Sequence, residues 1–254
     1  MVSQEGTTRL EFNRFNDLPF VAHGIFTRVG GFSTAPFDSL NVGLSAGDSR
    51  ETVLKNRQLI SRTLGGGTPV YLNQVHSDTV LALKKDDTGN LPAMAGDRVA
   101  DAVVTDIPGL ALVIQVADCQ AVILVDPVKR VVANIHSGWK GSVSNIIART
   151  MDTMEGTFGS SPGDILAGIG PSLGPCCAEF VNYRAEIPEH LWHYKDGNDH
   201  FDFWRISRDQ LQEQGVNAWN IVQAEICTRC SPDTYFSYRH EKVTGRFASV
   251  IKII

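Results

Sequence analysis

The sequence predicts an α/β or α+β fold, in which mixed β-sheets are flanked by helices in one layered domain. Two observations carry this prediction. Short runs rich in β-branched residues follow one another from residue 102 onward, and segments with helical periodicity lie before and after them. The composition agrees with a globular core, because 43% of the 254 residues are hydrophobic and the formal net charge is −5, which excludes a disordered chain.

The first regular element that the sequence predicts is a helix over residues 48–64. Asp48 stands at the N-cap position and Glu51 follows three residues later, which is the pattern of a capping box. Apolar residues fall on one face of this segment, and the glycines at 65–67 end it. We therefore expect an amphipathic helix here.

The middle of the chain predicts a run of strands separated by turns such as Pro108-Gly109 and Asp126-Pro127. The expected strands cover residues 102–105, 110–117, 121–126 and 130–136. The runs at 110–117 and 121–126 are apolar on both faces, so we expect their sheet to be covered on both sides.

Alternating elements continue to the C-terminus. We expect a helix from Ser142 to Met154, a strand over residues 164–170, and a second helix capped by Ser207 and Gln210 that ends at Gly215. The tail at 246–254 predicts a final strand, and the polar stretch at 84–90 a surface loop. No linker or repeat divides the chain, so residues 1–254 are expected to form one domain, with 1–22 as a lead-in to a core that begins near His23.

Charge and cysteine content narrow the class of protein. A pI near 5.8 gives no basic patch for nucleic acid. The first 20 residues carry charges throughout, and the longest apolar stretch, Leu110 to Val116, is too short to cross a bilayer, so we expect a cytoplasmic protein without membrane contact. Five cysteines are an odd number, which argues against a disulfide framework and for thiols that are buried, bind a metal or act as nucleophiles.

Three segments place a polar residue of ligand type at the end of an apolar run, which is where sites are commonly built. They are residues 73–76, 116–119 and 134–139. If the strands at 121–126 and 130–136 pair as a hairpin, Cys119 and His136 come close together.

Two chemistries remain open for these residues. One cysteine and two histidines could bind zinc and leave its fourth position free, as in catalytic zinc sites, although the gaps between His76, Cys119 and His136 match no tight zinc spacing. Alternatively, Cys119 could be a thiolate nucleophile with His136 as its base, and Asp118 or Asn134 could orient the imidazole. A buried cysteine with two hydrogen-bonded histidines is the structural alternative to both.

Other polar residues are weaker candidates. Arg28 precedes Gly30-Gly31 and could bind an anion such as phosphate or form a surface salt bridge. Arg239 has aromatic neighbours, and Asn41 could hydrogen-bond a sugar or form a turn.

The remaining cysteines are expected to be structural. Cys227 and Cys230 have CxxC spacing, but a lone pair of this kind is weak evidence for zinc. Cys176 and Cys177 are adjacent, so we do not expect both to face one site, although their loop could line a pocket.

Seven motifs in a fixed order carry a family resemblance. They are His23–Arg28 with Gly30-Gly31, Ser39–Gly43, Gln74–His76, Ala117–Cys119, His136–Gly141, Gly170–Cys176 and Phe236–Arg239. Together they resemble the laccase-domain purine nucleoside phosphorylase family, formerly called multicopper polyphenol oxidases and also described as peptidoglycan editing factors. The resemblance covers residues 23–254. The sequence departs from the family motifs at three positions: Ser137 replaces the usual alanine, Lys140 the usual arginine, and His240 a second arginine after Arg239. The loss of that second arginine argues against a bidentate phosphate contact beside Arg239.

The resemblance implies a fold, a metal and an activity. The fold would be the layered α/β arrangement distantly shared with cysteine-hydrolase-like toxin domains. His76, Cys119 and His136 would bind Zn²⁺, or copper where it is available, and Arg28, Asn41 and Arg239 would lie around the substrate. The implied reactions are phosphorolysis of adenosine, inosine, guanosine and methylthioadenosine, and deamination of adenosine. Nucleoside and phosphate would then be the partners of a monomer or homodimer.

Two other activities are weighed against this one. A cysteine hydrolase or amidase acting on peptidoglycan precursors would use a metal-free, reactive Cys119. A copper-dependent polyphenol oxidase ranks third, because a multicopper site takes roughly ten histidines and this chain has seven.

Overall fold

The computed structural model, described here for residues 1–84 and 98–254, contains two mixed sheets packed face to face. The first has the strand order β1-β2-β3-β12-β7-β4 and the second β11-β10-β8-β9-β6-β5. The strands are β1 (Val2–Gln4), β2 (Thr7–Leu10), β3 (Val21–Phe26), β4 (Thr68–Tyr71), β5 (Val80–Leu83), β6 (Ala102–Thr105), β7 (Leu110–Val116), β8 (Gln120–Asp126), β9 (Val131–Ser137), β10 (Leu166–Ile169), β11 (Ile221–Gln223) and β12 (Phe247–Ile253). The predicted α/β class with mixed sheets is confirmed. The predicted loop at 84–90 lies, apart from Lys84, outside the described residues.

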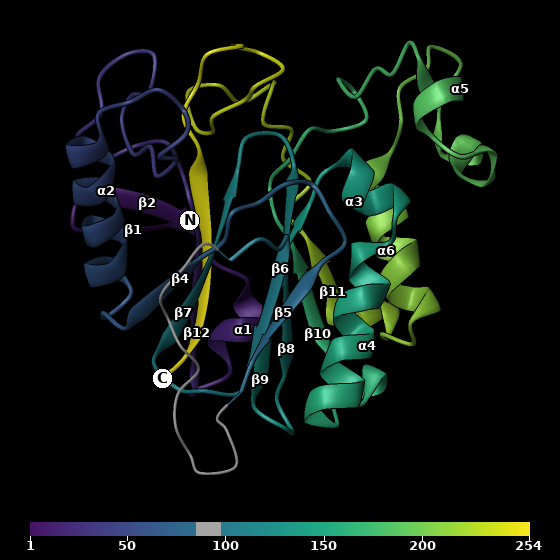
Figure 1. Cartoon of the computed structure of the whole chain (residues 1–254), viewed down its shortest axis with the longest axis horizontal. Helices are drawn as coiled ribbons and strands as arrows, with labels where there is room; N and C mark the ends of the chain where they lie inside the picture. Colours follow the sequence, from purple (N-terminus) through teal and green to yellow (C-terminus); the bar gives the residue numbers. More distant parts are fainter. Residues whose placement is uncertain (85–97) are drawn as a thin grey trace.

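Helices cover the outer face of each sheet, so the molecule is built in four layers (Figure 1). Helix α2 lies on the first sheet, and α3, α4 and α6 lie on the second. The helices are α1 (Asn13–Asn16), α2 (Arg50–Thr63), α3 (Trp139–Val143), α4 (Ile146–Phe158), α5 (Tyr183–Glu186) and α6 (Phe203–Glu213), with short 3₁₀ turns at Pro162–Asp164, Glu189–Tyr194 and Ala218–Asn220. None of the helices in the described ranges is long and apolar enough to cross a membrane.

Strands β7 and β8 are apolar on both faces because both faces are buried. Ile114 of β7 and Ile123 of β8 lie in the core between the two sheets. Val113 points the other way, toward α2, and Val122 points toward α4. The expectation that these runs are covered on both sides is confirmed, since the alternation of a strand sends successive side chains into different cores.

The sequence predicts the runs at 110–117 and 121–126 in one sheet, and this prediction is wrong. β7 and β8 do not share a sheet, although three residues separate them. Asp118, with φ of 89°, turns the chain out of the first sheet, and Cys119 leads into the second. The hairpin expected between 121–126 and 130–136 is present as β8 and β9, in which Ala121 pairs with His136.

Helix boundaries were also predicted imperfectly. Ser49 occupies the N-cap position of helix α2 without a capping hydrogen bond from its side chain, while the Asp48 carboxylate accepts a hydrogen bond from the hydroxyl of Ser33. The predicted 142–154 helix is two helices, because Asn145 adopts a left-handed conformation and caps α4.

Helix α6 begins earlier than predicted. It is capped by Asp202, and both predicted caps are buried inside the helix. Ser207 hydrogen-bonds the side chain of Gln120, and Gln210 donates to the carbonyl of Ser142 at 2.7 Å.

The segment before His23 belongs to the packed domain. Residues 2–10 form β1 and β2 at the edge of the first sheet, and Phe12 and Phe15 are buried in the core between the sheets. His23 stacks on Phe12 and its Nε2 accepts the backbone N–H of Phe12 at 2.7 Å. The core thus extends further toward the N-terminus than the sequence predicts.

Candidate metal centre and active site

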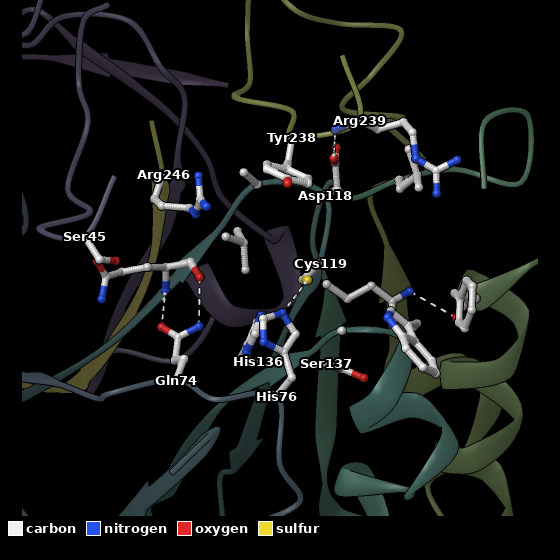
Figure 2. Close-up of a pocket in the computed structure, with 18 of the residues that line it drawn as sticks. Ser45, Gln74, His76, Asp118, Cys119, His136, Ser137, Tyr238, Arg239 and Arg246 are labelled. Carbon is white, nitrogen blue, oxygen red and sulfur yellow. Dashed lines mark hydrogen bonds between the residues drawn. The ribbon is translucent and has the colours of Figure 1, made fainter. Parts of the chain in front are cut away.

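The candidate site lies where the chain crosses between the sheets. Cys119 sits at the crossing itself, directly before β8. His136 lies on the neighbouring strand β9, close to the register position of Cys119, and His76 arrives on the loop that follows β4. Three separate segments therefore bring these side chains together (Figure 2).

The three predicted ligand residues come together in space. One ligand atom from each of His76, Cys119 and His136 lies within 4.8 Å of the other two. The Cys119 sulfur is 3.7 Å from Nε2 of His76, and the two imidazole rings meet edge to face with centroids 4.8 Å apart. This is the arrangement that a three-ligand metal centre requires.

Asp101 organises the site from behind. Its Oδ1 accepts hydrogen bonds from Nδ1 of His136 at 2.7 Å and from the backbone N–H of His76 at 3.0 Å. Its Oδ2 accepts the backbone N–H of Ser77 at 2.6 Å and the Ser77 hydroxyl at 2.7 Å. One fully buried carboxylate thus fixes the His136 ring and the loop of His76, leaving Nε2 of His136 for a metal.

Neither of the two residues predicted to orient the imidazole does so. The Asp118 carboxylate accepts the Thr228 hydroxyl at 2.7 Å and the backbone N–H of Arg239 at 2.6 Å. Asn134 donates to the carbonyls of Leu112 and Ser249 and so ties the two sheets together. Sequence reasoning missed Asp101 because a lone aspartate before a strand has no characteristic spacing.

Ionisation in the site follows from these contacts. Burial opposes charge on Asp101, but hydrogen bonds from His136 and Ser77 outweigh it and lower the pKa of Asp101 to about 2. Burial likewise opposes charge on Cys119 and His136, yet their mutual attraction, with help from Asp101 and His76, lowers the pKa of Cys119 to about 6 and raises the pKa of His136 to about 9. A thiolate and an imidazolium are therefore favoured near neutral pH before a metal binds. The thiolate is the form that binds metal, whereas His136 must release its Nε2 proton when a metal binds.

Because Gly138 has no side chain, His76 and Cys119 can pack directly against its backbone. A Cβ at this position would lie 2.8 Å from Cδ2 of His76 and 3.0 Å from the Cys119 sulfur. The donor set of two imidazoles and one thiolate suits Zn²⁺ or copper, and three protein ligands leave a fourth position for a substrate or water. The residues present therefore fit a catalytic metal.

A cavity of about 660 Å³ opens beside the three ligands. Its walls combine aromatic side chains with cationic ones, which suits a ligand having both a flat ring and negative charge. In Figure 2 Tyr238, Arg239 and Arg246 lie on the opposite side of Cys119 from His76. The aromatic and cationic side chains in its lining include Trp139, Phe180, Tyr238, Arg239, Lys242 and Arg246.

The structure brings one of the three predicted substrate contacts to this cavity. Arg239 lines it, although its Nη1 also donates to the carbonyls of Cys177 at 3.2 Å and Glu179 at 3.1 Å. The guanidinium of Arg28 does not line the cavity: it donates to the carbonyls of Asp38 at 2.7 Å and Pro232 at 2.8 Å.

Asn41 is also absent from the cavity wall. It is fully buried, and its Oδ1 accepts the backbone N–H of Arg246 at 2.8 Å. Asn41 therefore positions Arg246, which does line the cavity and which the sequence did not single out. One feature of the sequence could have indicated Arg246: it lies at the start of the last predicted strand, and sites commonly form at strand ends.

Fold and site together define a class: a two-sheet sandwich with a His-Cys-His metal-type centre in the wall of a polar and aromatic cavity. The sequence model of the family described as multi-copper polyphenol oxidoreductase laccase matches residues 22–254. The chain belongs to this family.

Relatives in this family are similar over most of their length. The chain is 33% identical to Purine nucleoside phosphorylase YfiH of Escherichia coli, covering 90% of this chain and 92% of the relative. It is 36% identical to Purine nucleoside phosphorylase SCO2081 of Streptomyces coelicolor, covering 91% and 95%. The crystal structure of YlmD from Geobacillus stearothermophilus superposes with a TM-score of 0.86 at 28% identity, covering 100% of this chain and 98% of that one.

Proposed function

We propose that this protein is a zinc-dependent purine nucleoside phosphorylase that also deaminates adenosine. The observation that carries the proposal is the convergence of His76, Cys119 and His136 in the wall of a cavity of about 660 Å³ that also has aromatic and cationic lining. Relatives named purine nucleoside phosphorylase support it. A cavity of this volume accommodates a nucleoside together with phosphate.

Substrate binding is assigned to the walls of the cavity. Trp139, Phe180 and Tyr238 offer faces and edges against which a purine can pack. Arg246 and Lys242 supply positive charge for phosphate, and Asn41 holds the backbone of Arg246 in place. In this proposal Arg28 and Asn41 support the surrounding loops.

Phosphorolysis needs positioning more than it needs a nucleophile from the protein. A phosphate oxygen forms a bond to C1′ of the ribose, the C1′–N9 bond breaks, and the electron pair leaves with the purine, which takes up a proton. Cationic side chains neutralise the phosphate and hold it against C1′. Ribose 1-phosphate and free purine are the products.

Deamination of adenosine exchanges the C6 amino group for the oxygen of water and releases ammonia and inosine. When bound, zinc supplies Lewis acidity, which lowers the pKa of water and polarises an oxygen. The contribution of Asp101 is to hold His136 with Nε2 free and to keep the His76 loop in place. Gly138 keeps the approach to Cys119 open.

A cysteine hydrolase is the competing function, because Cys119, His136 and Asp101 also form a chain of the kind that activates a thiol. His76 argues for the metal, since a nucleophile with one base and one orienting carboxylate has no use for a second imidazole 3.7 Å from its sulfur.

The test is an assay of adenosine and inosine with zinc-loaded and chelated protein, with and without phosphate. We expect phosphate-dependent release of adenine and hypoxanthine, and phosphate-independent conversion of adenosine to inosine, both lost on chelation. A Cys119→Ala variant should lose both reactions. Retention of both by a metal-free Cys119→Ala protein would overturn the proposal, and activity of chelated wild type that iodoacetamide abolishes would favour the thiol mechanism.

A further inference from the structure

Four cysteines outside the cavity form a second cluster. Cys176 and Cys177 follow β10, and Cys227 and Cys230 follow β11, which runs parallel to it. All four sulfurs lie within 4.8 Å of one another. The expectation that Cys176 and Cys177 cannot both face one site is wrong, and the CxxC pair at 227–230 is not alone.

The backbone holds the two loops in register around this cluster. Parallel strands release their loops at the same edge of the sheet. Ser172 and Cys227 then extend the ladder as a parallel bridge, in which the N–H of Ser172 donates to the carbonyl of Ile226 at 3.1 Å and the N–H of Thr228 donates to Ser172 at 3.0 Å. The cysteines are therefore brought together by regular pairing.

We propose that Cys176, Cys177, Cys227 and Cys230 bind a structural Zn²⁺ ion. Zinc bonds to thiolate at about 2.3 Å in a tetrahedron, which places the sulfurs about 3.8 Å apart. The Cys230 sulfur is 3.7 Å from that of Cys176 and 3.5 Å from that of Cys177. A disulfide would require about 2.05 Å.

Groups around the cluster suit thiolate ligands. The backbone N–H of Gly174 donates to the Cys227 sulfur at 3.3 Å, and Nη1 of Arg229 donates to the Cys177 sulfur at 3.4 Å. Four thiolates and one Zn²⁺ carry a formal charge of about −2, which Arg229 partly neutralises. Hydrogen bonds of this kind from outside the ligand shell orient and stabilise metal ligands.

Two of the four cysteines are buried and two are exposed, which suits a metal site with four protein ligands that an ion can enter from solvent. Cys177 and Cys227 are buried, whereas Cys176 and Cys230 are exposed, so an ion can reach the cluster from solvent. With four protein ligands, no position is left for substrate, which indicates a structural rather than a catalytic role.

The loops that this site would join form one wall of the candidate active site. Leu173 and Phe180, on either side of the first cysteine pair, line the cavity. Arg239, also in the wall, donates to the carbonyl of Cys177. The Thr228 hydroxyl, beside Cys227, donates to Asp118. A zinc ion here would hold this wall in place from outside the cavity.

Zinc content per chain tests the proposal. The full chain is reduced, stripped with a chelator and reloaded with zinc without oxygen, and bound zinc is measured after desalting. We expect two zinc ions in the wild type, one in Cys119→Ala, and one in the double variant Cys176→Ser/Cys230→Ser. The two variants control for each other, and the serines replace side chains that are exposed.

The Cys119→Ala variant separates this proposal from the proposed function, because it leaves the four-cysteine cluster unchanged. Loaded with Co²⁺, it should show the absorption of a tetrahedral four-thiolate site, and Cys176→Ser/Cys230→Ser should lose that spectrum. Failure of the active-site proposal alone would leave one ion in the wild type and in Cys119→Ala. A Cys119→Ala protein that binds neither Zn²⁺ nor Co²⁺ when its four thiols are reduced would overturn the inference, as would a cobalt spectrum unchanged in the double variant.

Discussion

Gly138→Ala is the sharpest perturbation of the candidate metal centre. The backbone at Gly138 has φ of −76° and ψ of 176°, which alanine adopts without strain, so the added methyl acts through its contacts. Those contacts would be 2.8 Å to the His76 ring and 3.0 Å to the Cys119 sulfur. At least one ligand must then move by about 0.5 Å, since carbon contacts are favourable near 3.5–4.0 Å.

Such a displacement exceeds what a metal centre tolerates. Ligand distances are held to about 0.2 Å, and disturbing the surroundings of a site costs about 10–100-fold in affinity, or about 1.4–2.7 kcal/mol. We expect Gly138→Ala to weaken zinc binding by at least that factor. The loss of helix stability should be smaller, about 1 kcal/mol, because Gly138 is only the N-cap of α3.

Competition with a chelating dye measures this affinity, in the Cys176→Ser/Cys230→Ser background so that one site is read. The matched control is Gly156→Ala, on α4, where a Cβ meets nothing within 4 Å and alanine should add about 0.5–1 kcal/mol of stability without changing zinc affinity. Equal zinc affinity in Gly138→Ala and Gly156→Ala would refute the assignment of the three ligands.

Substitutions at Asp101, Arg246 and His23 test the support of the site and of the core. Asp101→Asn should lower zinc affinity about 10–100-fold, measured by the same competition, because the neutral amide no longer fixes the imidazole; unchanged affinity would contradict the role given to Asp101. Arg246→Gln should raise the KM for phosphate more than the KM for nucleoside, whereas Arg205→Gln, an exposed arginine on α6, should change neither. Burial lowers the pKa of His23 from 6.5 to about 4, so the unfolded state takes up the proton first as pH falls. The free energy of unfolding should therefore be independent of this group above pH 6.5, fall by about 3 kcal/mol between pH 6.5 and 4, and level off below; urea titrations across this range check it, and a His23→Phe variant should lose that part of the pH dependence.

The strands could be predicted from the sequence because burial on both faces leaves continuous apolar runs. Their partition between sheets could not. The neighbouring apolar runs at 110–117 and 121–126 predict two strands of one sheet, but the left-handed turn at Asp118 sends β7 and β8 into different sheets. The same turn creates the site, since it places Cys119 at the junction of the two sheets. The predicted N-terminus of α6 was wrong because Ser207 and Gln210 are residue types that often cap helices. In the fold their side chains instead form buried hydrogen bonds with residues distant in the sequence.

The candidate ligands could be identified because His76, Cys119 and His136 each end an apolar run. The residues that support the site from remote positions in the sequence show no such pattern. Asp101 is far from His76 and His136 in sequence, and Asn41 supports Arg246 from 205 positions away. These pairings depend on the packing of the two sheets, which a single sequence does not specify.

The odd number of cysteines is explained by the way the fold divides them. One thiol, Cys119, stands with two histidines at the cavity, and three protein ligands are the number that a catalytic zinc takes. Four thiols stand together behind the wall, and four is the number of protein ligands that a tetrahedral structural zinc takes. Asp118 connects the two, because it precedes Cys119 and its carboxylate accepts hydrogen bonds from Thr228 and from Arg239. Removing the proposed structural zinc should therefore weaken substrate binding in the active site, because Asp118 and Arg239 connect the two sites. The His-Cys-His centre and its support by Asp101 should remain intact.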